Sequence, residues 1–200
     1  MGCYASPGAV AVRPHDRSTA PAATIASVPA ARQLFILRHA KSSWNDPALE
    51  DRERPLAPRG RQAVKLLAEH VSASAIRPEQ VLVSPARRAR ETLEGVAPAG
   101  EIIVEPELYG ATAKSLLERL TRVPDEIGSV MLIGHNPAMQ ALVLELADSS
   151  SSDPALVGTL SHKFPTGALA TLELETSWGD LCPGRAVLTG LVRPKDLREH

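Results

Sequence analysis

The chain has 200 residues, with 22 Lys and Arg against 23 Asp and Glu, a formal net charge of −1. This length suits one domain with a substantial core, and the balanced charge disfavours nucleic acid and anionic membranes as main partners. Its two cysteines, Cys3 and Cys182, lack the paired spacing of a disulfide framework or zinc site, which favours the reducing cytoplasm. No apolar run approaches the roughly 20 residues of a membrane span.

Residues 1–32 differ from the rest of the chain. They are rich in Ala, Pro, Ser and Thr and follow neither a helical nor a strand period. This composition predicts a disordered N-terminal arm ahead of a folded domain over 33–200. Two alternatives remain open. The arm has three Arg and one acid, a bias found in transit peptides, and Gly2 with Ser6 matches the N-myristoylation pattern beside Cys3, a candidate palmitoylation site.

From Gln33 onward, short apolar strands alternate with amphipathic helices. The spacing predicts, in chain order, a strand over 34–37, a helix over 57–71, a strand over 81–83, a helix over 86–96, a strand over 102–104, a helix over 113–120, a strand over 130–133 and a helix over 137–146. A flexible loop is expected over 147–154, followed by strands over 168–175 and 186–192 whose short link predicts an antiparallel hairpin. This alternation predicts a three-layer α/β/α fold, with a mostly parallel sheet covered by helices on both faces.

Polar residues follow three of these strands directly. Arg38 and His39 end the first strand. The segment 84–88, which closes with Arg88, follows the second strand, and His135 follows the fourth. Because ligands bind at the carboxyl ends of the strands in open α/β sheets, these side chains are expected to converge. Arginine binds phosphate oxygens through its planar fork, so the pattern predicts a phosphate site.

A histidine at a rigid strand end can act as a nucleophile toward phosphorus. Neutral imidazole is the attacking form, and we expect Arg38 and Arg88 to disfavour the imidazolium form of His39. The arginines would also offset charge on the transferring phosphoryl group, while His135 donates a hydrogen bond to it. The predicted reaction therefore passes through a phosphohistidine intermediate. It calls for neither a metal nor another cofactor.

Two further residues are candidate phosphate ligands. Arg54 lies near a predicted helix start, where acids rather than bases are electrostatically favoured, so an anion pocket would explain it. Ser42 could touch phosphate as well, although a turn after the strand explains it equally. Arg59 and Arg61 are expected on a solvated face.

Four motifs resemble, in the same order, those of the histidine phosphatase superfamily, also called phosphoglycerate mutase-like: "LRHAKSSW", "RPLAPRGRQA", "SPARRARET" and "IGHNP". The resemblance extends from Gln33 to about Val192, with Ala40 in place of the glycine of the family's Arg-His-Gly signature. It implies a phosphoglycerate mutase-like fold and a catalytic set whose members are Arg38, His39, Arg88 and His135.

Within this superfamily, the small SixA-type phosphohistidine phosphatases are the most similar group, on the stretches "RHAKSSW", "ERPLAPRG", "LYGA" and "FPTGALATLEL". This resemblance implies removal of phosphate from phosphohistidine on a protein, typically a histidine phosphotransfer domain, without a metal. Two alternatives stay open. The protein could hydrolyse small phosphorylated metabolites, or it could be a phosphate-binding module without turnover.

One departure from the wider family bears on the substrate. Many members carry a glutamate after the third strand that protonates an alcohol leaving group, whereas Gly110 stands at that position here, as SixA-type proteins also lack the acid. An alkoxide leaves poorly without such an acid, but a phosphorylated imidazole can leave neutral once its ring is protonated. Glu107 remains a candidate proton donor, provided that it reaches the site.

Overall fold

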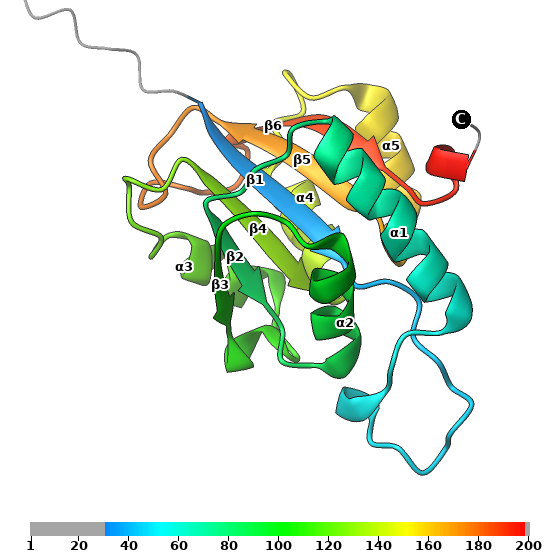
Figure 1. Ribbon diagram of the computed structural model, residues 1–200. Coiled ribbons are helices and arrows are strands. Elements are labelled where there is room, and N and C mark those ends of the chain that lie inside the picture. Colours follow the sequence, from blue (N-terminus) through cyan, green and yellow to red (C-terminus); the bar gives the residue numbers. More distant parts are fainter. Residues whose placement is uncertain (1–30, 199–200) are drawn as a thin grey trace, which may run out of the picture.

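The computed structural model describes residues 31–198, so all but the last two residues of the expected arm, with Cys3 and the acylation pattern, lie outside the described residues. The middle layer is a six-stranded sheet in the order β3-β2-β4-β1-β5-β6 (Figure 1). Its strands are β1 (Arg32–Arg38), β2 (Gln80–Val83), β3 (Glu101–Val104), β4 (Ser129–Gly134), β5 (Leu169–Leu174) and β6 (Ala186–Val192). The helices are α1 (Pro58–Ala73), α2 (Arg87–Val96), α3 (Ala113–Leu120), α4 (Ala138–Leu146) and α5 (Pro154–His162), with 3-10 turns η1 (Asp51–Glu53), η2 (Pro106–Leu108) and η3 (Asp196–Arg198).

The sheet is mostly parallel, as predicted. β4 pairs in parallel with both β1 and β2, and β2 pairs in parallel with β3. β5 and β6 form the predicted antiparallel hairpin, and β5 also pairs antiparallel with β1. The central strands β1 and β4 are therefore neighbours although more than 90 residues separate them in the chain.

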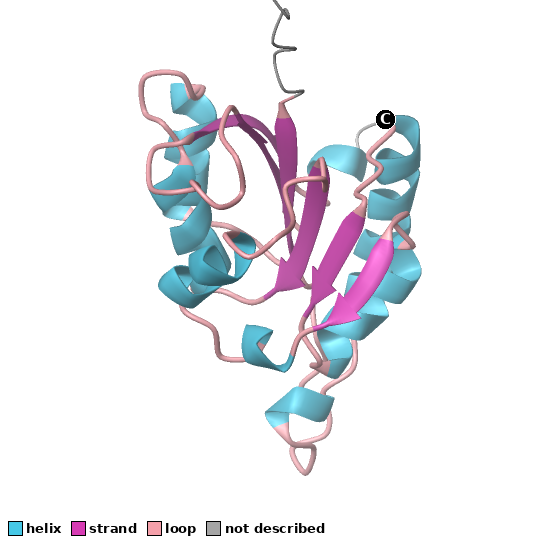
Figure 2. Cartoon of the chain, turned by 90° about the vertical axis from the view of Figure 1, so that its left-hand side faces the viewer, coloured by secondary structure: helices cyan, strands magenta, loops and turns pink. Residues whose placement is uncertain are grey.

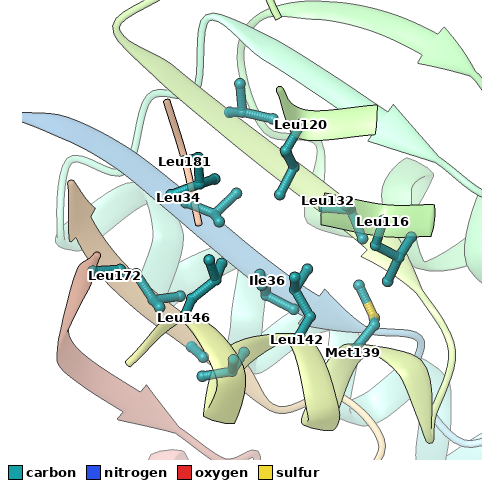
Figure 3. Close-up of a cluster of buried hydrophobic side chains, with 14 of the residues drawn as sticks. Leu34, Ile36, Leu116, Leu120, Leu132, Met139, Leu142, Leu146, Leu172 and Leu181 are labelled. Carbon is teal, nitrogen blue, oxygen red and sulfur yellow. The ribbon is translucent and has the colours of Figure 1, made fainter. Parts of the chain in front are cut away.

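Alternating side chains of β1 enter two separate cores, one on each face of the sheet. Leu34 and Ile36 pack into the larger core with α3, α4 and α5 (Figure 3). Phe35 and Leu37 pack on the opposite face with α1 and α2. Because all four side chains are buried, the strand reads as a continuous apolar run, typical of a sheet covered on both faces. The three-layer α/β/α prediction is confirmed (Figure 2).

Element bounds agree with the predictions to within two residues, and those of α3 and β6 agree fully. The exception is α5, for which no helix was predicted. Its start carries a recognisable signal, because the Asp153 side chain accepts a hydrogen bond from the amide of Ala155 and Pro154 occupies the first turn. Gly158 within the helix weakened its apolar period.

None of the helices in residues 31–198 is long and apolar enough to cross a bilayer. Cys182 is an exposed free thiol within the segment that joins β5 to β6.

Candidate active site

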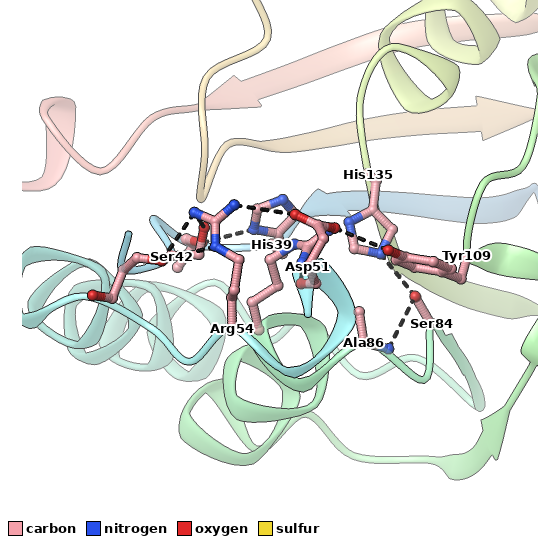
Figure 4. A network of polar contacts seen from close by, with 11 residues as sticks. His39, Ser42, Asp51, Arg54, Ser84, Ala86, Tyr109 and His135 are labelled. Atoms are coloured by element: carbon pink, nitrogen blue, oxygen red, sulfur yellow. Dashed lines mark hydrogen bonds and ion pairs between the residues drawn. The ribbon is translucent and has the colours of Figure 1, made fainter. Parts of the chain in front are cut away.

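The strand order places the carboxyl ends of β1, β4 and β2 side by side. These ends carry His39, His135 and the segment that leads into α2 with Arg88. The imidazole rings of His39 and His135 lie with their centroids 5.0 Å apart (Figure 4). The convergence predicted for the histidines and Arg88 is thus seen in the structure.

His39 is held in one orientation and one tautomer. Its backbone N–H donates to the carbonyl of Gly134 (3.0 Å), which ties the end of β1 to the end of β4. Its Nδ1 lies 2.7 Å from the carbonyl oxygen of Ala40. A carbonyl can only accept, so Nδ1 carries the proton and Nε2 keeps its lone pair. The side chain needed for nucleophilic attack is therefore oriented before any ligand arrives.

His39 is also neutral. Burial is the main reason why the pKa of His39 falls from 6.5 to about 3; the hydrogen bond to Ala40 opposes this, and His135, Arg88 and Arg38 lower it further. The sequence-based expectation of a neutral His39 has the right direction. Its stated cause was incomplete, because loss of hydration at a residue only 7% exposed outweighs the arginines.

The second histidine is fixed by a serine. Nε2 of His135 lies 2.7 Å from Oγ of Ser84, which accepts a hydrogen bond from the amide of Ala86 (3.3 Å). When the Ser84 hydroxyl donates to Nε2 of His135, the ring proton lies on Nδ1. Burial, and then Arg88, lower the pKa of His135 to about 4, so this ring is neutral too. Its Nδ1 is buried and has no protein partner, which suits a donor that awaits a ligand.

From its position directly before Pro85 in the sequence, Ser84 would be expected to cap the following helix. The structure corrects this, because α2 begins after Ala86 and has no side-chain cap. Instead, the buried hydroxyl of Thr92 organises this region: it donates to the carbonyl of Arg88 (2.6 Å) and accepts from the amide of Ala40 (3.0 Å). The threonine that ends the "SPARRARET" motif thus connects the arginine helix to the His39 loop.

Sequence reasoning missed Tyr109 and, at the centre of the cluster, Asp51. The Asp51 carboxylate accepts hydrogen bonds from Nη2 of Arg88 (2.9 Å), Nη1 of Arg54 (3.1 Å) and the hydroxyl of Tyr109 (2.9 Å). Partial burial opposes ionisation, yet hydrogen bonds from Tyr109 and Arg88 prevail and lower the pKa of Asp51 below its ordinary value. Its spacing of three residues from Arg54 hinted at one contact, but its contacts with Arg88 and Tyr109 depend on the fold.

Arg54 belongs to this cluster through Asp51, and its contact with phosphate stays a prediction. Its side chain is buried, its Nε donates to the carbonyl of Ser43 (3.0 Å), and its guanidinium carbon lies 3.0 Å from the ring centroid of Trp44. Ser42 is buried beside it, with Oγ 3.5 Å from Nη2 of Arg54. In this structure Ser42 therefore helps to position the side chain of Arg54.

Arg38 reaches the same edge from the end of β1. Its Nη1 donates to the carbonyl of Phe164 (2.7 Å), and its Nε is buried without a protein partner. Arg59 and Arg61 are exposed, as expected, although Arg61 donates to the carbonyl of Leu56 (2.6 Å).

Glu107 does not join the cluster. Its side chain is exposed and lines a surface hollow of about 430 Å³ together with Glu105 and Arg119. Gly110, where the wider family has its acid, has a φ of +80°, a conformation that an L-residue enters only with strain. Within residues 31–198, no three His, Cys, Asp or Glu side chains are arranged to hold a metal ion.

Comparison with known proteins decides the family. A family model described as the histidine phosphatase superfamily (branch 1) matches residues 34–113. An uncharacterized protein of Mycobacterium tuberculosis is 36% identical over 159 residues, which are 80% of this chain and 100% of that protein. The chain belongs to the histidine phosphatase superfamily. It is a phosphatase, as the motifs indicated.

Two relatives connect this histidine phosphatase to one group of the superfamily. The phosphohistidine phosphatase SixA of Escherichia coli is 31% identical over 153 residues, which cover 72% of this chain and 87% of that protein. A solved structure assigned as a phosphohistidine phosphatase SixA, from Nakamurella multipartitia, superposes with a TM-score of 0.73 at 28% identity, over 82% of this chain and 96% of that one. The SixA resemblance recognised from the motifs is confirmed.

Proposed function

We propose that this histidine phosphatase removes phosphate from phosphohistidine on a protein, such as a histidine phosphotransfer domain, through a covalent intermediate on His39. The observation that carries the proposal is the state of Asp51. It is the carboxyl group hydrogen-bonded within the cluster, and its lowered pKa keeps it ionised at neutral pH. An ionised carboxylate paired with two arginines holds no proton to donate as a general acid.

The first step is attack by His39. Its Nε2 lone pair forms a bond to phosphorus while the bond from phosphorus to the substrate's imidazole nitrogen breaks. That nitrogen keeps the electron pair of the broken bond, and the substrate ring leaves neutral if its other nitrogen carries a proton. Arg38, Arg88 and the Nδ1 proton of His135 would stabilise charge on the phosphoryl oxygens during the transfer.

The second step regenerates the enzyme. A water oxygen forms a bond to phosphorus, the bond to Nε2 of His39 breaks, and the imidazole recovers its lone pair. The proton of the water passes to the released phosphate or to solvent. One water molecule is consumed, and inorganic phosphate and the free histidine are the products.

The leaving group then selects the substrate. An alkyl phosphate releases an alkoxide, for which a general acid contributes about 10²–10⁴-fold in rate. Glu107 lies outside the cluster and Asp51 is ionised, so neither supports that chemistry. A phosphorylated imidazole does not need such an acid. This difference favours phosphohistidine over the small phosphorylated metabolites that remain the alternative.

A non-catalytic binding module receives less support. Phosphate binding needs the arginines alone, whereas here the Nδ1 contact of His39 leaves its Nε2 unprotonated, as a nucleophile requires. The free Nε2 has no evident purpose in a protein that only binds phosphate.

A side-by-side rate measurement tests the proposal. The substrates are a histidine-phosphorylated phosphotransfer domain, p-nitrophenyl phosphate and glycerol phosphate, with His39→Ala as the control for spontaneous hydrolysis. We expect kcat/KM for the phosphoprotein to exceed that for glycerol phosphate by at least about 10²-fold, with the aryl ester between them. Equal rates on the phosphoprotein and glycerol phosphate would reject the proposal and favour hydrolysis of small phosphorylated metabolites.

The cytoplasmic location is part of the same proposal and rests on the cysteine usage of the chain. A fusion to a fluorescent protein at the C-terminus tests it. Recovery of the fusion in an organelle, shortened at its N-terminus, would instead favour the transit-peptide reading of residues 1–32.

A further inference from the structure

A basic surface begins next to the candidate active site. Two adjoining hollows of about 350 and 420 Å³ share the side chains of Pro165, Arg193 and Lys195. The cations that line them, here called the basic face, are Lys41, Arg59, Lys163, Arg193, Lys195 and Arg198. Of the described residues that line the two hollows, none is acidic.

Most of this charge is not neutralised locally. Among residues 31–198, Lys41, Arg59, Lys163 and Lys195 take part in no ion pair. Arg193 is the exception, because Asp196 binds it through two contacts of 2.7 and 2.9 Å. The whole chain has a formal net charge of −1, so the basic face is a local concentration of positive charge rather than a general property.

The basic face connects to the catalytic centre through the backbone. Lys41 lies two residues after His39 on the same loop. Lys163 precedes Phe164, whose carbonyl accepts a hydrogen bond from the Arg38 side chain. The amide of Gly167 donates to the carbonyls of Arg38 and His39 (3.0 and 3.1 Å). In Figure 1, α1 and α5 cover opposite faces of the sheet, and the terminal turn η3 lies near α1. A molecule seated on the basic face would therefore lie beside the phosphoryl pocket.

We propose that the basic face docks an acidic surface of the phosphorylated protein substrate, next to the side chain that enters the pocket. This inference rests on the proposed function and specifies the partner's chemistry. The cations come from four separate segments, the loop after β1, the start of α1, the end of α5 and the chain after β6, which is broader than a single phosphate group requires.

An exposed aromatic lies on the same loop as Lys41, and the net charge of −1 on the whole chain favours a protein partner over nucleic acid. Trp44 is 71% exposed and lies over Arg54, whose guanidinium contacts Asp51 in the site cluster. Tryptophan and arginine are enriched among the residues that dominate protein interfaces. An acidic protein surface could contact Trp44 and the basic face together while it presents a phosphorylated side chain to His39.

Charge complementarity of this kind acts mainly on association. Opposed charged surfaces raise association rates by about 10–10³-fold at low ionic strength, and salt suppresses the effect. The basic face should therefore affect kcat/KM for a phosphoprotein at low salt, and leave untouched the turnover of a small ester that has no acidic surface.

The test compares two charge-reversal pairs. Lys163→Glu with Lys195→Glu reverses two exposed cations of the basic face, and Lys114→Glu with Arg122→Glu makes the same change at α3 and just after it. The substrates are an acidic histidine-phosphorylated phosphotransfer domain and p-nitrophenyl phosphate, at about 20 and 300 mM NaCl. We expect the first pair alone to lower kcat/KM for the phosphoprotein at least tenfold at low salt, with p-nitrophenyl phosphate within twofold of the wild type and the difference lost at high salt.

Other results overturn the inference. Equal losses in both pairs, or an equal loss on p-nitrophenyl phosphate, would show that the basic face does not act by docking. Binding of the unphosphorylated domain, measured by calorimetry, separates this inference from the proposed function. Binding that the first pair abolishes, without hydrolysis of phosphohistidine, would refute the function and keep the docking surface. No binding, or tighter binding of a DNA or RNA oligonucleotide at 150 mM salt, would refute the docking surface.

Discussion

Two loops at the same edge of the sheet carry an acid paired with an arginine, and they differ in what the pair can do. The loop between β1 and α1 places Asp51 against Arg88 and Arg54, within the cluster that holds both histidines. The loop between β3 and α3 places Glu105 against Arg119, and this pair lines a surface hollow with Glu107. One acid–arginine ion pair thus lies inside the candidate site, and the other lies outside it.

Strand order explains the difference. β1 lies next to β4 and is separated from β2 by β4 alone, whereas β3 is one of the two outermost strands of the sheet. A loop that follows β1 covers the point where both histidines emerge, but a loop that follows β3 reaches it only through a long side chain. Tyr109 does reach it, with its hydroxyl 2.9 Å from Asp51, and its ring lies edge-on to His135 at 5.7 Å. A residue's function in this fold therefore depends on the strand it follows as much as on its side-chain chemistry.

The largest expected effect tests the central member of the cluster. We expect His39→Ala to lose at least about 10³-fold in kcat, the scale of losses on removal of a nucleophile. The wild type, quenched during turnover, should yield a phosphoprotein that is labile in acid and stable in base, and the variant should yield none. Undiminished turnover by His39→Ala would remove the basis for assigning any of the cluster residues.

The next largest difference in activity is expected between the two arginine–acid pairs, Arg88 with Asp51 and Arg119 with Glu105. Arg88→Ala should cost about 3 kcal/mol of transition-state stabilisation, near 10²-fold in kcat/KM, because it removes a charge donor to the phosphoryl group. Arg119→Ala, which breaks the pair with Glu105, is the matched control and should leave kcat/KM within twofold. Similar losses in both variants would mean that position relative to β1 and β4 does not distinguish the two loops.

This contrast also shows how far the sequence could predict the site. Residues that follow strands directly, such as His39 and His135, were placed correctly because a strand fixes the direction of its last residue. Glu107 and Asp51 lie within loops, and the side-chain directions there depend on contacts with other segments. The hydrogen bond from the amide of Leu56 to Glu91 (2.7 Å) joins the Asp51 loop to α2, and neither residue stood out in the sequence.

The fold was easier to predict than the site. Burial on both faces of the sheet leaves a strong apolar signal in β1, β2 and β4, and the helices of the two outer layers keep their amphipathic period. α5 was missed because Leu160 is its one fully buried side chain, so its period is weak. The pairing of β5 with β1 could not be predicted, because strand neighbours far apart in the chain leave no local pattern.

His39, which is buried, and His135, which is partly buried, should make the stability of the protein depend on pH. The pKa of His39 is about 3 in the folded protein against 6.5 unfolded, and that of His135 is about 4. Below pH 6.5 the unfolded chain therefore binds protons that the folded protein does not, and stability falls as pH falls toward these values. Between pH 7 and pH 5 each histidine should cost about 2 kcal/mol of unfolding free energy.

Urea unfolding at pH 7 and pH 5 measures this cost. His39→Gln should lose about 2 kcal/mol less than the wild type over that interval, since it lacks one of the two groups. Ser161→Ala, an exposed substitution outside the cluster that removes no titratable group, is the control and should lose as much as the wild type. Identical losses in all three proteins would contradict neutral burial of His39.

The smallest expected effect separates two residues of one loop, Tyr109 and Glu107. Asp51 engages Nη2 of Arg88 with its carboxylate and Nη1 with its backbone carbonyl, so a phosphate dianion must compete with Asp51 for this guanidinium. The Tyr109 hydroxyl helps to hold the Asp51 carboxylate in place, and a partly exposed hydrogen bond of this kind contributes about 0.5 kcal/mol. Tyr109→Phe should therefore lower the inhibition constant of inorganic phosphate about twofold, because Asp51 is displaced more easily, whereas Glu107→Gln should leave it unchanged. Competitive inhibition of p-nitrophenyl phosphate hydrolysis measures both constants. A higher constant in Tyr109→Phe would show that the hydroxyl binds phosphate directly, and an equal shift in Glu107→Gln would place both residues of the β3 loop at the site.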